Sequence, residues 1–243
     1  MYQWSTLRSF AGVVLCIPLL HLALLVSTGV RDYLDPSPEV WDDEMEALIA
    51  SDLKAAIPQR PVVVIGGQRV RLWKELPARL APQPTLMRPL GDATLDDLIY
   101  HFDRLVAFYR PRMLIVFPGY ADLHIRDSKS PDEFRTRLEE LLELDSGFGS
   151  TNWRYVIAPL QMPLHPADFE RVSKMVAESR KLEKRLSHLT VIDPNPILAD
   201  SEGRPNPAFF RGDGINLNPE GYARISLLLE SAMDTEKQLG GPK

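Results

Sequence analysis

FFRGDGINLNPEGYARI, residues Phe209–Ile225, is the most informative stretch of this 243-residue chain. Asn218-Pro219 is a strong helix start, because an Asn side chain accepts hydrogen bonds from free backbone N–H groups and Pro at the first helical position loses none. From Pro219 to about Met233, apolar residues recur at helical spacing. The loop Asp213–Asn216 places an acid and an amide three residues apart just before this helix. We therefore expect a polar site at the start of a C-terminal helix.

Upstream of this stretch, runs typical of buried strands alternate with helical patterns. The apolar, partly β-branched runs predict strands at Pro61–Ile65, Thr85–Met87, Arg112–Phe117, Arg154–Ala158 and Leu189–Ile192. Helical spacing is found at Val40–Ala56, Val70–Leu80, Thr94–Tyr109, from Pro131 onward and at Ala167–Leu186. This alternation predicts an α/β fold with three layers, α/β/α, around a doubly wound, parallel, five-stranded sheet. Ligands of such sheets bind beyond the carboxyl ends of the strands.

Composition is that of one globular domain with an appendage. The net charge is −5 and no basic run is present, which argues against a nucleic-acid partner. Cys16 is the single cysteine, so an intramolecular disulfide is excluded.

The appendage is an apolar run near the N-terminus. Phe10–Val26 contains no charged residue and, extended to Val30, reaches the roughly 20 residues that cross a bilayer. A cleaved signal peptide is the alternative, although the run exceeds the roughly 7–15 apolar residues of a signal-peptide core. Arg8 precedes the run and several acidic residues follow it, which favours a cytoplasmic N-terminus. We expect a single-pass protein of a bacterial inner membrane with its domain in the periplasm, or a secreted or periplasmic protein if the signal is cleaved.

These observations predict five segments along the chain. They are a cytoplasmic N-terminus (1–9), a transmembrane anchor or signal peptide (10–30), a linker with a leading helix (31–57), the α/β domain (58–236) and a flexible tail (237–243).

Four segments of the α/β domain resemble, in order, the sequence blocks of the SGNH/GDSL hydrolase family. Val64–Gln68 (VIGGQ) stands where the family has a strand followed by G-D-S, and Leu90–Leu98 resembles the second block, whose glycine supplies a backbone donor. Pro118–Leu123 resembles the third block, G-x-N-D, and Asp213–Tyr222 resembles the last, D-G-x-H-L-N-x-x-G-Y. The resemblance covers about residues 61–233 and implies a flavodoxin-like fold.

The family resemblance implies hydrolysis of an ester or acyl group, or acetyl transfer, often on lipids or polysaccharides. In this family a serine attacks a carbonyl, a histidine takes the proton and an aspartate orients the histidine. Backbone N–H groups and an asparagine side chain hold the oxyanion. Here Gln68 stands at the nucleophile position, Ala121 replaces the oxyanion asparagine, and Asn216 replaces the histidine, while Gly91 and Asp213 are retained. An amide can neither attack nor accept a proton near neutral pH, so the ordinary triad is absent.

The retained positions predict a ligand-binding site at Gln68, Gly91, Tyr120, Asp213 and Asn216. We expect the backbone N–H groups of Gln68 and Gly91 to point into the pocket, and the Asn216 amide to donate to Asp213. Amide side chains would suit sugar hydroxyls or an acyl carbonyl. The alternatives are that Asp213 and Asn216 only fix their loop, and that side chains such as Tyr120 fill the cleft.

Substitute catalysts have little support in the sequence. His124 follows the third block and His165 lies in a loop after the fourth strand, but a lone loop histidine is usually just exposed. Asp122, His124 and Asp213 could form a metal trio, but no motif spacing supports it. No metal and no cofactor are predicted.

The expected function is a membrane-anchored, extracytoplasmic SGNH/GDSL-like domain without triad catalysis. It would bind or scaffold in the cell envelope, with a glycan, an acyl group or a partner protein as ligand. One alternative is a hydrolase or acetyltransferase that uses non-standard residues, and another is a structural subunit of an envelope complex.

Overall fold

The computed structural model describes residues 14, 16–27, 35–124 and 126–238. The predicted cytoplasmic N-terminus (1–9), both ends of the predicted span, residues 31–34 of the linker and 239–243 of the tail lie outside this part. Residues 16–27 are helical and expose their large apolar side chains. Within the described ranges, every helix is too short or too polar for a bilayer crossing. The anchor at 10–30 stays a prediction, because part of it lies outside the described residues.

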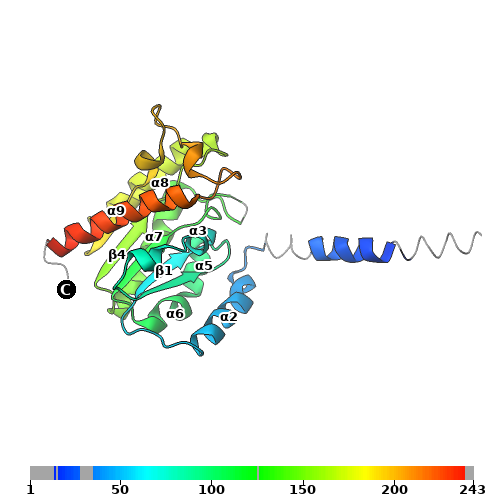
Figure 1. The fold of residues 1–243 in the computed structure, drawn as a ribbon, viewed down its shortest axis with the longest axis horizontal. Helices are drawn as coiled ribbons and strands as arrows, with labels where there is room; N and C mark the ends of the chain where they lie inside the picture. Colours follow the sequence, from blue (N-terminus) through cyan, green and yellow to red (C-terminus); the bar gives the residue numbers. More distant parts are fainter. Residues whose placement is uncertain (1–13, 15, 28–34, 125, 239–243) are drawn as a thin grey trace, which may run out of the picture.

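Five parallel strands form one sheet, as the sequence predicts, and their order is β2-β1-β3-β4-β5 (Figure 1). The strands are β1 (Val62–Gly66), β2 (Thr85–Pro89), β3 (Met113–Phe117), β4 (Trp153–Ile157) and β5 (Leu189–Ile192). Every residue of β1 is buried, which suits a central, β-branched strand of a parallel sheet. Because β1 lies between β2 and β3, the strand order reverses there, and the loops after β1 and β3 flank the point where such sheets bind ligands.

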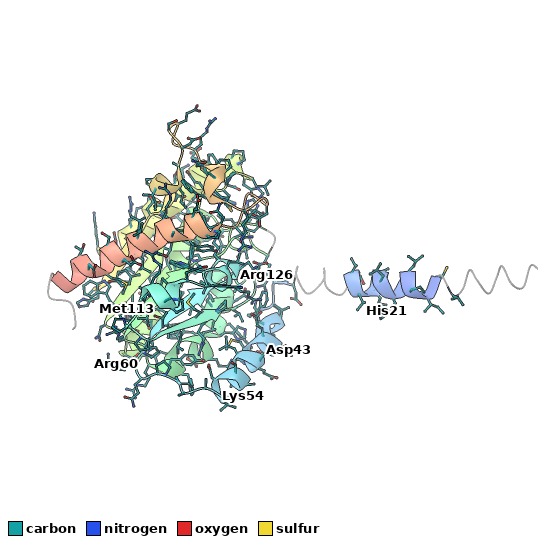
Figure 2. All side chains as sticks on the ribbon, viewed as in Figure 1. His21, Asp43, Lys54, Arg60, Met113 and Arg126 are labelled. Atoms are coloured by element: carbon teal, nitrogen blue, oxygen red, sulfur yellow. The ribbon has the colours of Figure 1, made fainter. Side chains whose placement is uncertain are left out.

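Helices cover both faces of the sheet. One layer holds α3 (Gln68–Leu72), α4 (Leu76–Arg79) and α9 (Pro219–Gln238), and the other holds α5 (Leu95–Tyr100), α6 (Phe102–Leu105), α7 (Pro131–Phe148) and α8 (Phe169–Leu182) (Figure 1). In the first layer, Trp73 Nε1 donates to Ser226 Oγ at 3.0 Å. In the second, α7 packs on both α5 and α8. Side chains fill the space between the sheet and these layers (Figure 2).

Two predicted helices are broken into shorter ones. The helix predicted at Val70–Leu80 is interrupted at Trp73, whose ψ of 61° leaves the helical region. The helix predicted at Thr94–Tyr109 ends first at His101 and again at Val106 (φ −129°), and a 3-10 helix, η2 (Ala107–Tyr109), completes it. Hydrophobic spacing identified the buried faces of these segments, but it does not report such local changes of backbone conformation.

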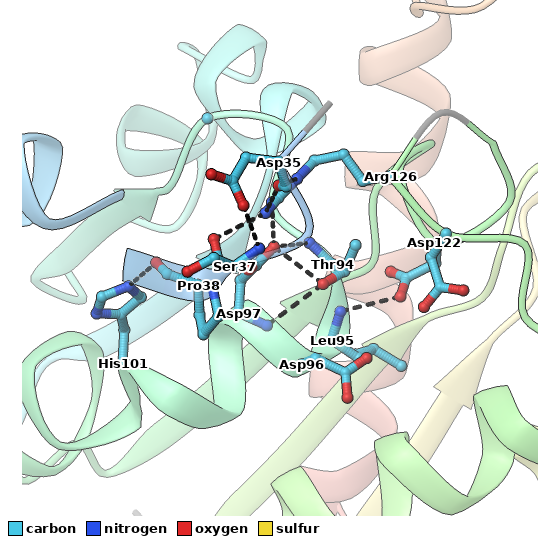
Figure 3. Close-up of polar contacts among 12 residues, drawn as sticks. Asp35, Ser37, Pro38, Thr94, Leu95, Asp96, Asp97, His101, Asp122 and Arg126 are labelled. Carbon is cyan, nitrogen blue, oxygen red and sulfur yellow. Dashed lines mark hydrogen bonds and ion pairs between the residues drawn. The ribbon is translucent and has the colours of Figure 1, made fainter. Parts of the chain in front are cut away.

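Residues 35–52, here called the N-terminal strap, run from Arg126 in the loop after β3, past Gly91 in the loop after β2, to Arg88 of β2. The strap contains η1 (Pro38–Trp41) and α2 (Asp42–Asp52). The buried guanidinium of Arg126 donates to the carbonyls of Asp35 and Ser37, pairs with Asp97, and lies 5.0 Å from the Trp41 ring centre (Figure 3). At the far end, Asp52 forms a 2.7 Å ion pair with Arg88. The strap is therefore fastened to the domain at both ends.

Candidate functional site

The nucleophile position is built at the end of β1. Gly66 has φ +150°, and a Cβ there would lie 2.2 Å from the carbonyl oxygen of Phe117 at the end of β3, so only glycine fits. Gly67 is the N-cap of α3, and Gln68 is its first residue. The sequence therefore places Gln68, half-buried, at the carboxyl edge of the sheet, as expected.

The backbone donor of Gly91 is not free. Its N–H donates to Glu44 Oε1 of the N-terminal strap at 3.3 Å, and Glu44 also pairs with Arg71. Gly91 has φ +35°, and a Cβ there would lie 1.7 Å from the Trp41 ring, so the strap covers this loop closely. The prediction that this N–H points into an open pocket is therefore wrong, because a carboxylate from 47 residues upstream accepts it.

The Asp213 loop has the hydrogen bond that the sequence predicted. Asn216 Nδ2 donates to Asp213 Oδ2 at 2.8 Å, while the N–H groups of Ile215 and Asn216 donate to Oδ1 at 2.9 Å. Burial acts to raise the pKa of Asp213, but these hydrogen bonds outweigh it and lower that pKa. Asn218 Oδ1 accepts from the Gly221 N–H at 3.0 Å, which confirms the predicted helix start. The carboxylate is thus committed to its own loop.

Ala121 and Asp122 of the third block, in the loop after β3, are buried. The methyl side chain of Ala121 offers no hydrogen-bond donor. Asp122 is 1% exposed; its Oδ1 accepts from the Leu95 N–H at 2.9 Å, and Lys129 Nζ lies 3.6 Å away (Figure 3). Burial raises the pKa of Asp122 to about 7. Asp122 therefore joins this loop to α5 and is not available to the cleft.

A group of rings lies beyond the ends of β3 and β4. The ring centres of His124 and His165 are 4.4 Å apart, and Tyr120 stacks on both at 5.0 and 5.4 Å. The Tyr120 hydroxyl is 2.8 Å from His165 Nε2, and His124 Nε2 is 2.5 Å from Asp168 Oδ2. Burial, together with His124, lowers the pKa of His165, and burial raises that of Tyr120. The structure therefore gathers His124 with His165 and Asp168, and not with Asp122 and Asp213 as the trio considered from the sequence would require.

Several residues near the site could not be singled out from the sequence. Arg69 follows Gln68, is 1% exposed, and donates to the Pro118 carbonyl at 3.3 Å. Burial lowers its pKa to about 10. Glu44 and Trp41 reach Gly91 only through the tertiary fold. Asp168 has one sequence signal, its position three residues after His165, which is one turn of a 3-10 helix.

No family model and no curated protein sequence matches this chain. Solved structures do. A protein assigned as a platelet activating factor in Streptococcus pneumonia superposes with a TM-score of 0.68 at 13% identity, over 88% of this chain and 98% of its own. A GDSL-like lipase from Bacteroides thetaiotaomicron gives 0.64 at 14% identity, over 79% and 97%. The chain has the SGNH/GDSL hydrolase fold.

A third structure with this SGNH/GDSL fold, a protein assigned as an acylhydrolase in Bacteroides fragilis, gives a TM-score of 0.66 at 16% identity over 79% of this chain and 97% of its own. Each of these structures is covered almost completely, so the described residues contain nearly the whole of the shared fold. Identities this low support the fold alone, and the function must be argued from the site residues.

Proposed function

We propose that this chain is an SGNH/GDSL-fold domain that does not use triad catalysis and instead binds or scaffolds in the cell envelope. The observation that carries the proposal is the Asn216–Asp213 pair. The amide at the base position donates to the acid at 2.8 Å, and an amide cannot take a proton from a nucleophile. Gln68 at the nucleophile position has no ionisable oxygen, so the first step of acyl transfer lacks both its nucleophile and its general base.

The oxyanion donor supports the same proposal. A substrate oxygen that develops negative charge needs free N–H groups, and here the Gly91 N–H already faces the Glu44 carboxylate. The Glu44 carboxylate accepts this N–H and is also paired with Arg71. Like charges at this position repel, so the site opposes an oxyanion.

The proposed location rests on the N-terminal sequence. Residues 10–30 contain no Asp, Glu, Lys or Arg and match the length of a bilayer-crossing helix. We place the domain on the outer side of a bacterial inner membrane, where a glycan, an acyl group or an envelope protein would be the ligand. Half-buried Gln68 and Asn216 carry amides that suit sugar hydroxyls and acyl carbonyls.

A second candidate function is ester or acyl transfer through other residues. It is favoured by the Tyr120 hydroxyl, which lies 2.8 Å from His165 Nε2, because a hydroxyl within hydrogen-bond reach of an imidazole is the general form of an activated nucleophile.

Ester hydrolysis separates the two candidates. The full-length chain, purified in detergent, is assayed with short and long p-nitrophenyl acyl esters beside the variants Tyr120→Phe, Glu44→Gln and Asp213→Ala. The proposal expects wild-type turnover no higher than that of all three variants. Turnover above background that is lost in Tyr120→Phe, Glu44→Gln or Asp213→Ala, with folding unchanged by circular dichroism, would overturn the non-catalytic proposal. Carbonate extraction of cell membranes tests the anchor, since release of the intact chain into the supernatant contradicts it.

A further inference from the structure

Three metal-ligating side chains converge on one edge of the domain from two neighbouring loops. His124 follows the turn after β3, whose N–H groups at Leu123 and His124 both donate to the Tyr120 carbonyl. His165 and Asp168 lie at the two ends of one turn, η3 (Pro166–Asp168), after β4. Because β3 and β4 are adjacent and parallel, the sheet brings these loops together.

The ligand atoms already lie close to one another. One atom from each of His124, His165 and Asp168 is within 4.8 Å of the other two, and His124 Nε2 is 2.5 Å from Asp168 Oδ2. Ligands on one zinc ion are bonded at about 2.0–2.2 Å, which puts them roughly 3–3.5 Å apart. All three side chains are only half-buried, so they have room to rotate toward that spacing.

We propose that His124, His165 and Asp168 form a binding site for a divalent transition-metal ion of the zinc class. Two imidazoles and one carboxylate are a ligand set that zinc and similar ions prefer, whereas magnesium and calcium prefer oxygen ligands alone. With three protein ligands, the ion keeps a coordination position for water or for an external ligand. The site goes beyond the proposed envelope role and does not depend on it.

The surroundings also resemble those of a metal site. Arg171 Nη2 donates to Asp168 Oδ1 at 2.9 Å and to the Leu123 carbonyl at 2.9 Å, so it fixes the carboxylate and leaves Oδ2 toward His124. Such outer contacts orient metal ligands in known sites. The Tyr120 hydroxyl, 2.8 Å from His165 Nε2, is placed to contact the ion or its water. The Arg171 charge opposes the cation, so we expect moderate affinity.

The simpler interpretation is a hydrogen-bonded His124–Asp168 pair with no ligand. That pair accounts for two of the three side chains. It does not account for His165, which a separate loop holds against both His124 and the Tyr120 hydroxyl.

Calorimetric titration of the full-length chain with zinc chloride, in detergent buffer containing excess magnesium, tests the proposal. We expect one equivalent to bind with a Kd of about 10 µM or tighter, and cobalt(II) to show visible absorption bands of a nitrogen-ligated ion. The variants His124→Ala, His165→Ala and Asp168→Asn should each weaken binding by at least about 10-fold. His188→Asn is the matched control, since His188 is exposed, lies elsewhere and has φ 58°, which Asn tolerates.

Absence of zinc binding, binding unchanged in all three variants, or an equal loss in His188→Asn would overturn the proposal. His124→Gln and His165→Gln preserve side-chain size and replace any alanine variant whose circular dichroism differs from that of the wild type.

Discussion

Gly91→Ala is expected to lower the free energy of unfolding by about 2–5 kcal/mol, and much of this loss should depend on Trp41. A non-glycine residue in the left-handed region costs about 1–2 kcal/mol, and φ at Gly91 is +35°. The added Cβ would lie 1.7 and 2.0 Å from two atoms of the Trp41 ring, far inside contact distance. Relieving such an overlap typically costs about 1–3 kcal/mol.

A double-mutant cycle separates the two contributions. In a Trp41→Ala background the overlap with the Trp41 ring is removed, so the cost of Gly91→Ala should fall toward the about 1–2 kcal/mol of the backbone strain. Urea unfolding of the full-length chain, followed by far-UV circular dichroism, measures all four proteins. Gly147→Ala is the control. Gly147 is exposed in α7 with no atom within 4 Å of an added Cβ, so alanine should raise the free energy of unfolding by about 0.5–1 kcal/mol. An equal cost of Gly91→Ala in both backgrounds would refute the argument that the strap lies on this loop.

Three further substitutions test the loops around the site. Burial raises the pKa of Asp122 to about 7, so its contribution to stability is fully present below the unfolded pKa of about 4 and is lost as the pH rises through 7. Asp122→Asn should therefore flatten the fall in the urea midpoint between pH 4.5 and 7.5. An unchanged fall would contradict this. The pKa of Asp213 is lowered despite burial, mainly by the Asn216 hydrogen bond. Its contribution to stability therefore has the opposite pH dependence: it is present above about pH 4 and lost in acid. Asp213→Asn should reduce stability at pH 7 but not at pH 2.5. Asn218→Ala removes the cap of α9 and the Nδ2 donation to the Ala208 carbonyl, and should cost about 1–2 kcal/mol in chemical unfolding; no measurable loss would mean that the cap contributes nothing.

The preferences of neighbouring residues were sufficient to predict the main strands and helices of this protein. The β-branched run at residues 62–65 is a buried central strand, and Asn218-Pro219 starts α9, because each depends on the preferences of adjacent residues. The Asn216–Asp213 hydrogen bond was predictable for the same reason, since its partners are three residues apart. The parallel, five-stranded sheet was predictable from the alternation of strands and helices.

Contacts between distant segments were not predictable in this way. Glu44 meets the Gly91 N–H across 47 residues, and Tyr120 meets His165 across 45, and no spacing rule covers such distances. A single sequence contains the acidic residue and the glycine, but their pairing depends on how α2 packs on the sheet. The prediction that the Gly91 N–H points into the pocket depended on such a contact, and the tertiary structure overturned it.

The position of the N-terminal strap determines how the domain carries mechanical load. The strap begins at Asp35, on the N-terminal side of the domain. A pull on the N-terminal side therefore reaches the Arg126 hydrogen bonds to the Asp35 and Ser37 carbonyls first. Trp41 and Glu44 come next in series, and the sheet only after them. Under tension, the Gly91 loop would lose its cover while the sheet was still intact.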